Sequence, residues 1–441
     1  MNMIKKINLL YVLLLIVSCN NKQSKTEVLS SKIQSNKYFK FTKEKALTVM
    51  KTGFNAGDGY SEVWIRDFNT FIELSAEVFE SEVLKKNLLV FFKFQGVDGN
   101  IIDGFSPNIK EEMFFDKISN KERRYKFIYS ELEPLYLGHK NTVETDQETS
   151  LVQAVFKYVL ATGDEAILNE VIGDKSVADR LEFAMEFLLN ERFDEKHGLI
   201  WGATTADWGD VQPEHDWGVF LTEDTHYALD IYDNAMFLIA LDNLITLLPR
   251  LKERWHPIRN KIAKNVREHL WDETKQKFIP HVYLNGSPFP EDFNEDDVFY
   301  HGGTAVAIEA NLLSKDEIKV SLEKMISNVK VLDASSIGIT LYPAYPDSFF
   351  KNKSMVAYGY QNGGDWTWFG ARMIQQLIKN GFVEEAYEQM QPMVKRVKDN
   401  DGFYEWYTVK NEPMGSGTFK GSAGVLYDAI LLFERFASNN K

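Results

Sequence analysis

Three carboxyl side chains stand in aromatic surroundings where acid and base catalysis is chemically feasible. Asp207 and Asp210 lie in a segment rich in Gly and Trp, residues 201–210, and Glu405 lies in the aromatic stretch 403–407. Burial among apolar rings raises the pKa of a carboxyl group, as a general acid requires, and a second, ionised carboxylate can take a proton from water. The residue types therefore favour a two-carboxyl mechanism. The structural alternatives are caps or turns for the two aspartates and an ion pair for the glutamate.

A second group of polar and aromatic residues could hold a ligand. Arg66 and Asp67 closely follow Trp64. An arginine donates hydrogen bonds and an aspartate accepts them, so together they can bind adjacent hydroxyl groups. The alternative is that Asp67 caps a helix and has Arg66 as a buried partner. The remaining candidates are tryptophans, which could pack on a ligand or belong to the core, and one histidine at the start of a helical segment: Trp208, Trp366, Trp368, Trp406 and His301.

Neither a metal nor a cofactor is predicted, and nucleic acid is disfavoured as a partner. The 8 histidines lack metal-binding spacings, and the sequence has no phosphate-binding or dinucleotide-binding motif. Residues 291–297 are acidic but lack EF-hand spacing, which favours a solvated loop over a calcium site. The carboxylates of residues 145–150 could line a pocket or cap a helix. Lys and Arg total 50 against 64 Asp and Glu, and this net charge of −14 argues against binding to phosphate backbones.

The elements that would position these residues are mainly helices. From Phe68 onward, apolar residues recur at helical spacing, separated by loops rich in Gly, Asp and Trp. Residues 193–200 and 271–279 are two similar strand-like segments, each directly after a helix. They are weak evidence for an internal repeat of helical hairpins. No linker rich in Pro or Gly divides the interior, so one all-α domain is expected. The predicted helices are 68–79, 151–159, 177–189, 231–248, 255–270, 305–313, 318–329, 368–378, 383–397 and 424–436.

The N-terminal residues predict export. Residues 1–18 contain Lys5 and Lys6 and then an apolar run that is short for a membrane span, in the order typical of a secretory signal peptide. The tetrad Ile-Val-Ser-Cys that ends at Cys19, the only cysteine, resembles the lipobox of bacterial lipoproteins, although a plain signal peptide with an incidental cysteine is the alternative. The prediction is a signal peptide over 1–18, a polar tether over 19–37 and a catalytic domain over 38–441. A lipid on Cys19 would anchor the protein in the bacterial cell envelope, on the periplasmic side of the outer membrane or at the cell surface.

Several short motifs, in this order along the chain, resemble those of the six-hairpin glycosidases, the group that includes glucoamylases, trehalases and glycogen-debranching glucosidases. The resemblance extends from about Tyr38 to Phe436 and lies in the motif order rather than in close similarity to one member. The motifs are VWIRDF (63–68), DWGD (207–210), YDNA (232–235), NGGDWTW (362–368), GFYEWY (402–407) and GSAG (421–424).

This resemblance implies an (α/α)6 barrel with a sugar pocket built from loops at one end. It implies an inverting glycoside hydrolase with an oligosaccharide substrate, with Asp207 as the acid, Asp210 as its competitor and Glu405 as the base. The resemblance also implies that Arg66 and Asp67 bind the non-reducing sugar in the pocket. Two alternatives are a lyase or unsaturated-uronyl hydrolase on a similar toroid, which would need a more basic pocket, and a sugar-binding lipoprotein without catalysis.

Overall fold

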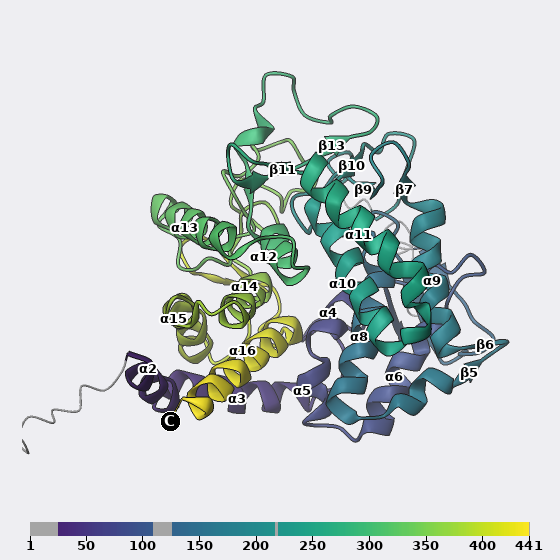
Figure 1. Ribbon diagram of the computed structural model, residues 1–441, viewed down its shortest axis with the longest axis horizontal. Helices are drawn as coiled ribbons and strands as arrows, with labels where there is room; N and C mark the ends of the chain where they lie inside the picture. Colours follow the sequence, from purple (N-terminus) through teal and green to yellow (C-terminus); the bar gives the residue numbers. More distant parts are fainter. Residues whose placement is uncertain (1–24, 109–125, 217–218, 441) are drawn as a thin grey trace, which may run out of the picture.

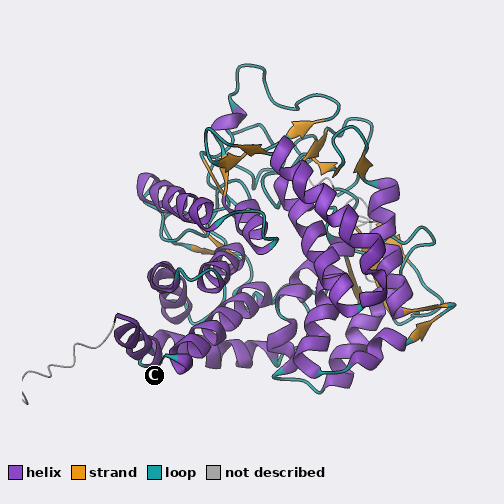
Figure 2. Ribbon diagram, in the orientation of Figure 1, coloured by secondary structure: helices purple, strands orange, loops and turns teal. Residues whose placement is uncertain are grey.

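Helices arranged in two concentric layers make up most of the described chain. The computed structural model describes residues 25–108, 126–216 and 219–440 (Figure 1). Within these residues, strands are two to five residues long and lie in the loops (Figure 2). The predicted (α/α)6 barrel with short strand-like segments in its loops is therefore confirmed.

The inner layer is a closed ring of helices. Each inner helix packs against the next one in the chain, and α16 packs against α4 and α5 to close the ring. Helices α10 and α12 are buried on all sides along their first halves, as expected for helices enclosed by others. The inner helices are α4 (Ile65–Thr70) with α5 (Ile72–Ala76), α8 (Gln147–Thr162), α10 (Ile231–Leu247), α12 (His301–Glu309), α14 (Thr367–Lys379) and α16 (Lys420–Asn439).

The outer layer consists of one helix before each inner helix. These helices are amphipathic: α15, for example, buries Val383, Ala386, Met390 and Val394, which lie on one face. Outer and inner helices thus alternate along the chain and form six hairpins. The outer helices are α3 (Lys37–Met50), α6 (Ser81–Lys93), α9 (Val177–Glu191), α11 (Lys252–His269), α13 (Lys315–Leu332) and α15 (Val383–Asp399).

Short antiparallel strands connect the helices. The two similar segments are confirmed as strand pairs that follow outer helices, β7–β8 after α9 and β11–β12 after α11. A sheet in the order β1-β2-β4-β3 lies before α4 and α8, and short 3-10 helices occur at η2, η3 and η4. The strands are β1 (Val63–Trp64), β2 (Gly104–Pro107), β3 (Lys126–Ile128), β4 (Tyr136–Lys140), β5 (Val171–Ile172), β6 (Lys175–Ser176), β7 (Phe193–Asp194), β8 (Leu199–Ile200), β9 (Gly202–Ala203), β10 (Tyr227–Leu229), β11 (Trp271–Asp272), β12 (Lys277–Phe278), β13 (Val282–Tyr283), β14 (Phe299–Tyr300), β15 (Leu341–Tyr342), β16 (Trp406–Tyr407) and β17 (Pro413–Met414); η2 is Glu165–Asn169, η3 is Pro249–Leu251 and η4 is Glu295–Asp297.

The predicted tether is wrong from Lys25 onward. Residues Lys25–Gln34 form helix α2, which packs against α16, and the Gln34 amide donates to the carbonyl of Ala437 at 3.4 Å. Asn36 then caps α3, because its side chain accepts from the backbone N–H groups of the second and third residues after it. The signal peptide and Cys19 lie outside the described residues. Among the described helices, none alone is long and apolar enough to cross a membrane, and α10 with the segment Pro249–His269 meets that test only as a pair bent by 119°.

A buried ion pair fixes the segment that carries Glu405. Arg396 of α15 donates to Asp365 at 2.8 Å, and both side chains are 1% exposed. Ser336 donates to the same carboxylate, so its oxygens are well satisfied. Asp365 and Tyr407 exchange two backbone hydrogen bonds of 2.9 and 2.8 Å, and Glu405 lies two residues before Tyr407. The pair therefore ties the outer layer to the candidate base.

Candidate active site

A cavity of about 250 Å³ lies at the end of the barrel where the inner helices begin. The first turns of α4 and α14 and the residues just before α8 and α16 all contribute to its wall. It is strongly acidic, with five carboxyl groups and one guanidinium among its described lining residues. The lining consists of Ala56, Tyr60, Trp64, Arg66, Asp67, Asp103, Asn141, Glu144, Trp208, Asp210, Tyr360, Gln361, Trp366, Trp368, Glu405 and Phe419.

The structure brings together most of the residues that the sequence singled out, but not all of them. Asp207, His301 and Trp406 are outside this lining. The residues that sequence reasoning missed come from segments with no recognised motif, and their proximity depends on the ring being closed. They are Ala56, Tyr60, Asp103, Asn141, Glu144, Tyr360, Gln361 and Phe419.

Glu405 has one oxygen anchored and the other available. Its Oε2 accepts from the hydroxyl of Tyr60 at 3.0 Å and from the N–H of Ser416 at 3.3 Å. Gly415 lies against this carboxylate with φ of +71°, and a Cβ there would collide with Oε2. Burial raises the pKa of Glu405, while the two hydrogen bonds oppose that rise. A carboxylate held in this way can act as a base through Oε1.

Tyr60 reaches Glu405 because its loop is fastened to the start of α16. Asp58 accepts from the N–H and the hydroxyl of Thr418 at 3.0 and 2.8 Å, and also from the hydroxyl of Ser416. The Ser416 and Thr418 hydrogen bonds lower the pKa of Asp58. The buried ammonium of Lys420 donates to the backbone and side-chain oxygens of Asn55, each at 2.7 Å. Segments about 360 residues apart in the sequence thus form one wall of the cavity.

Asp210 carries an oxygen that has no partner among the described residues. Its Oδ1 is buried and makes no hydrogen bond, while its backbone N–H donates to the Gln361 side chain at 3.2 Å. Two residues earlier, the carbonyl of Trp208 accepts from Arg66 at 3.2 Å. The loop is therefore held through its backbone, and the carboxyl group of Asp210 remains available to a ligand in the cavity.

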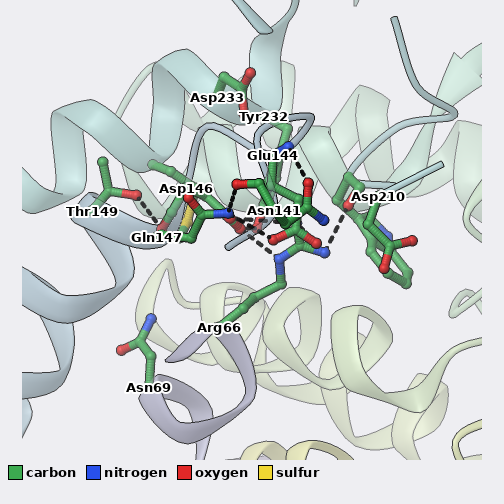
Figure 3. A network of polar contacts seen from close by, with 12 residues as sticks. Arg66, Asn69, Asn141, Glu144, Asp146, Gln147, Thr149, Asp210, Tyr232 and Asp233 are labelled. Carbon is green, nitrogen blue, oxygen red and sulfur yellow. Dashed lines mark hydrogen bonds and ion pairs between the residues drawn. The ribbon is translucent and has the colours of Figure 1, made fainter. Parts of the chain in front are cut away.

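Arg66 is committed to protein partners. It donates to Asp146 at 2.6 Å through Nε and lies 3.1 Å from Glu144 through Nη2, and Tyr232 also donates to Asp146 at 2.6 Å (Figure 3). The alternative that Asp67 is the buried partner of Arg66 is wrong, because Asp146 and Glu144 take that place. Arg66 positions the loops, and Nη1 alone retains a hydrogen for a ligand.

Asp67 is the more available member of the predicted pair. Its Oδ1 is buried without a hydrogen-bond partner among the described residues. Burial raises the pKa of Asp67 well above its usual value, and the neighbouring charge of Glu405 adds to the effect of burial while that of Arg66 opposes it. Asp67 can therefore meet a ligand hydroxyl as an acceptor when ionised or as a donor when protonated.

The choice of Asp207 as the acid is corrected by its hydrogen bonds. Both of its oxygens accept backbone N–H groups at the start of α12, from Gly302 and Gly303, each at 2.7 Å. Asp207 is 1% exposed, has φ of +56°, and is not among the described residues that line the cavity. Burial raises its pKa to about 8 although these two N–H groups oppose the rise. Its geometry is that of a structural support for α12, and Asp210 is the candidate acid.

His301 and Trp406 also differ from expectation. His301 is buried, with its ring nitrogens near the carbonyl of Ile337 at 3.2 Å and the amide of Asn328 at 3.0 Å, so it serves packing rather than a ligand. Burial lowers its pKa to about 4. Trp406 lies just outside the lining, with its ring 6.2 Å from that of Tyr360.

The tryptophans that line the cavity also belong to the core. Trp208 stacks on Phe369 with 4.3 Å between ring centroids and contacts Trp366 edge-on at 4.9 Å. Trp366 and Trp368 are 2% and 3% exposed. Both interpretations therefore apply: the rings pack in the core and form the deeply buried floor of the cavity.

Two further acids in the lining have altered proton affinity. Burial raises the pKa of Asp103 to about 7, against the opposing charge of Arg66, and burial likewise raises the pKa of Glu144. Of the predicted 145–150 carboxylates, Asp146 binds Arg66 and Tyr232 instead of lining the cavity.

In the acidic stretch 291–297, Glu295 is bound by His281, Tyr283 and Tyr345 at 2.7–2.8 Å, so the expectation of a wholly solvated loop is wrong there. In the described part of the chain, no cluster of three or more His, Cys, Asp or Glu residues has the arrangement of a metal site.

The fold is that of known glycoside hydrolases. No protein-family model and no curated protein sequence matches this chain. A GH63 mannosylglycerate hydrolase from Thermus thermophilus in complex with glucose is similar in structure, with a TM-score of 0.60, 16% identity, and coverage of 89% of this chain and 99% of that chain.

Two rhamnosidases are similar over part of their length. The rhamnosidase from Klebsiella oxytoca with rhamnose bound has a TM-score of 0.57, 12% identity, and coverage of 89% of this chain and 63% of that chain. The GH78 rhamnosidase of Bacillus sp. GL1 has a TM-score of 0.55 and 14% identity over 89% of this chain and 34% of that chain. All three are glycoside hydrolases of the six-hairpin superfamily. At these identities the likeness establishes the shared barrel.

Replacing Asp207 by Asn is expected to lower the free energy of unfolding by about 1–3 kcal/mol, because an amide NH2 would face one of the two backbone N–H donors. Asp210→Asn is the matched control in the same loop. It removes an unpartnered carboxyl oxygen and should leave stability nearly unchanged. Urea denaturation followed by circular dichroism measures both, and a larger loss in Asp210→Asn than in Asp207→Asn would contradict the assigned roles.

Proposed function

We propose that the protein is a glycoside hydrolase that removes one terminal sugar from a glycoside with inversion, with Asp210 as the general acid and Glu405 as the general base. The observation that carries this proposal is that both carboxyl groups line one cavity and each has an oxygen with no hydrogen-bond partner among the described residues. Their loops precede α10 and α16, which are three places apart in the six-membered inner ring. Such opposed positions suit an inverting pair, which needs carboxyl groups about 6.5–9.5 Å apart with room for water.

The chemistry assigns one proton transfer to each carboxyl group. Asp210 donates its proton to the glycosidic oxygen as the bond from that oxygen to the anomeric carbon breaks. Oε1 of Glu405 takes a proton from water, whose oxygen forms the new bond to the anomeric carbon on the opposite face. The proton on Glu405 and the lost proton of Asp210 are restored through solvent, so the net reaction consumes one water.

The size and charge of the cavity favour a small, neutral sugar as the bound group. A volume of about 250 Å³ lies below the usual range of about 300–1,000 Å³ for ligand pockets, which favours a single ring over a chain of sugars inside the cavity. A carboxylated sugar would meet five carboxyl groups and a guanidinium already bound to Asp146 and Glu144. This charge balance argues against the lyase or unsaturated-uronyl hydrolase alternative. The sugars named with the similar structures, glucose and rhamnose, are likewise neutral.

Substitution of either catalytic carboxyl group tests the mechanism. Glu405→Gln cannot take the proton from water and Asp210→Asn cannot give one, so each should lower kcat/KM by on the order of 10²–10⁴. Asp210→Asn should lose least on dinitrophenyl glycosides, whose departing oxygen needs little protonation. Rates on a panel of aryl glycosides and oligosaccharides, with the first product anomer followed by NMR, provide the measurement.

The matched control is Glu412→Gln, an exposed glutamate in the same β16–β17 hairpin, which should keep full activity. A fully active Glu405→Gln would end the two-carboxyl proposal. Binding of a sugar without turnover by the unmodified protein would instead support a sugar-capturing role.

The hydrogen bond from Tyr60 predicts a shift in pH dependence. Tyr60 stabilises the ionised form of Glu405, so Tyr60→Phe should raise the pKa of Glu405 further. A base is active only when ionised. The acidic limb of kcat/KM should therefore move to higher pH, by about one pH unit. Tyr404→Phe makes the same chemical change beside Glu405 and should leave the acidic limb of kcat/KM in place. A shift of this limb to lower pH in Tyr60→Phe would refute the role of Tyr60 in stabilising the ionised base.

We further propose that the protein is a lipoprotein anchored through Cys19 in the bacterial cell envelope. The support is the order of basic residues, apolar run and terminal cysteine in residues 1–19. Only five residues separate Cys19 from the start of α2, so an anchor there would hold the barrel close to the membrane.

Cys19→Ser, expressed in a bacterium with the natural signal, should move a folded protein from the membrane fraction to the soluble fraction, because the lipid provides the anchor. Lys25→Ser, in the first turn of α2, is a control that should remain membrane-bound. Immunoblots of the fractions measure this, and an unaltered distribution of the cysteine variant would exclude lipid anchoring at Cys19.

A further inference from the structure

Tyr360 adopts a backbone conformation that tyrosine rarely adopts, at the wall of the candidate active site. Its φ is +41°, in the left-handed region where a Cβ is crowded, and its side chain contributes to the cavity lining. Such conformations persist only where surrounding interactions compensate for the strain, and they concentrate at functional sites. The strained backbone of Tyr360 therefore indicates that the position of its side chain in the cavity wall matters for function.

Three neighbours fix this conformation. The carbonyl of Tyr360 accepts from the indole N–H of Trp366 at 2.9 Å and from the backbone N–H of Gly364 at 3.1 Å. A Cβ on Gly364 would collide with that carbonyl and crowd the ring of Trp406. The Tyr360 ring contacts Trp366 edge-on at 5.3 Å and Trp406 edge-on at 6.2 Å. Its ring is thus held against two tryptophans at the edge of the cavity.

The neighbours of Tyr360 in sequence place it beside the reacting groups. Gln361 accepts the backbone N–H of Asp210, the proposed acid. An acid acts on the oxygen of the departing group, so the adjoining wall faces that group. Tyr360 is partly exposed, whereas Trp366 and Trp368 are 2% and 3% exposed at the floor. A terminal sugar that occupies the floor would direct its leaving group towards Tyr360.

We propose that Tyr360, supported by Trp406, binds the leaving group and selects substrates whose leaving group is a ring, either a second sugar or an aryl group. This inference rests on the proposed hydrolase function and adds the chemistry of the departing half. An aromatic face packs on the C–H face of a sugar or on another aromatic ring. A methyl leaving group offers no ring for such packing. A carboxylated leaving group is disfavoured, because the one cation among the described lining residues, Arg66, is bound to Asp146 and Glu144.

The test compares two variants, in each of which a tyrosine at positive φ is replaced by glycine. Tyr360→Gly removes the ring and suits a φ of +41°, so the backbone has no reason to rearrange. Tyr358→Gly is the matched control, because Tyr358 also has a positive φ, +64°, but lies outside the cavity lining. The probes are the phenyl and methyl 1-thioglycosides of one sugar, the one hydrolysed fastest as its aryl glycoside. Sulfur in place of the glycosidic oxygen slows hydrolysis, so calorimetry can measure Kd.

Tyr360→Gly should weaken binding of the phenyl thioglycoside about three- to tenfold and leave that of the methyl thioglycoside nearly unchanged. Tyr358→Gly should preserve both values. Equal weakening of the two ligands in Tyr360→Gly, or no weakening of either, would overturn the leaving-group assignment. The proposed function can fail separately from this inference. A fully active Asp210→Asn would refute Asp210 as the acid, whatever Tyr360→Gly does to the two Kd values. An inactive Asp210→Asn, together with an unchanged ratio of the phenyl to the methyl thioglycoside Kd in Tyr360→Gly, would refute only the role of Tyr360.

Discussion

The buried guanidinium of Arg66 is the interaction on which the geometry of the cavity depends. It joins the start of α4 to Asp146 and Glu144 before α8, and to the carbonyl of Trp208 in the loop that carries Asp210. Although burial disfavours its charge, these carboxylates raise the pKa of Arg66, so the charge persists. Breaking a buried pair on one side typically costs about 3–5 kcal/mol, because the remaining charge has no partner. One side chain thus sets the relative positions of three loops that are unconnected in local sequence.

The direction of the inner helices explains how so many carboxyl groups can share this end. The inner helices α4, α8, α14 and α16 begin at the cavity wall, and a helix N-terminus carries partial positive charge that favours nearby anions. Asp207 uses this directly at α12. The second cavity, at the opposite end, is more balanced in charge: its lining includes the basic residues Lys157, Arg372, Lys379 and Arg435 and the acidic residues Glu73, Glu77, Glu309 and Asp428. Despite burial, Arg372 and Lys379 lower the pKa of Glu309 at that end to about 2.

The sequence predicted the architecture better than it predicted the site. Helical spacing marks α14 and α15 because their apolar side chains face the core at that period, whereas α2 was missed because its few buried residues, Ser30 and Ile33, give little signal. Short motifs identified Glu405 and Asp67, since both lie at the start of elements that reach the cavity. Tyr60 and Asp103 could not be found, because only closure of the ring brings their segments to the other lining residues.

Asp207 and Asp210 show why residue types alone do not assign the role of a carboxyl group. Three residues apart in one aromatic loop, they are equivalent in any pattern of residue types. Hydrogen bonds separate them: both oxygens of Asp207 are bound by backbone N–H groups, while Oδ1 of Asp210 has no partner in the described chain. A buried polar atom without a partner costs stability, and at the wall of a cavity a ligand can relieve that cost. By the same reasoning we expect a structural role for Asp146, whose oxygens accept from Arg66 and Tyr232, and a ligand contact for Asp67, whose Oδ1 has no partner among the described residues.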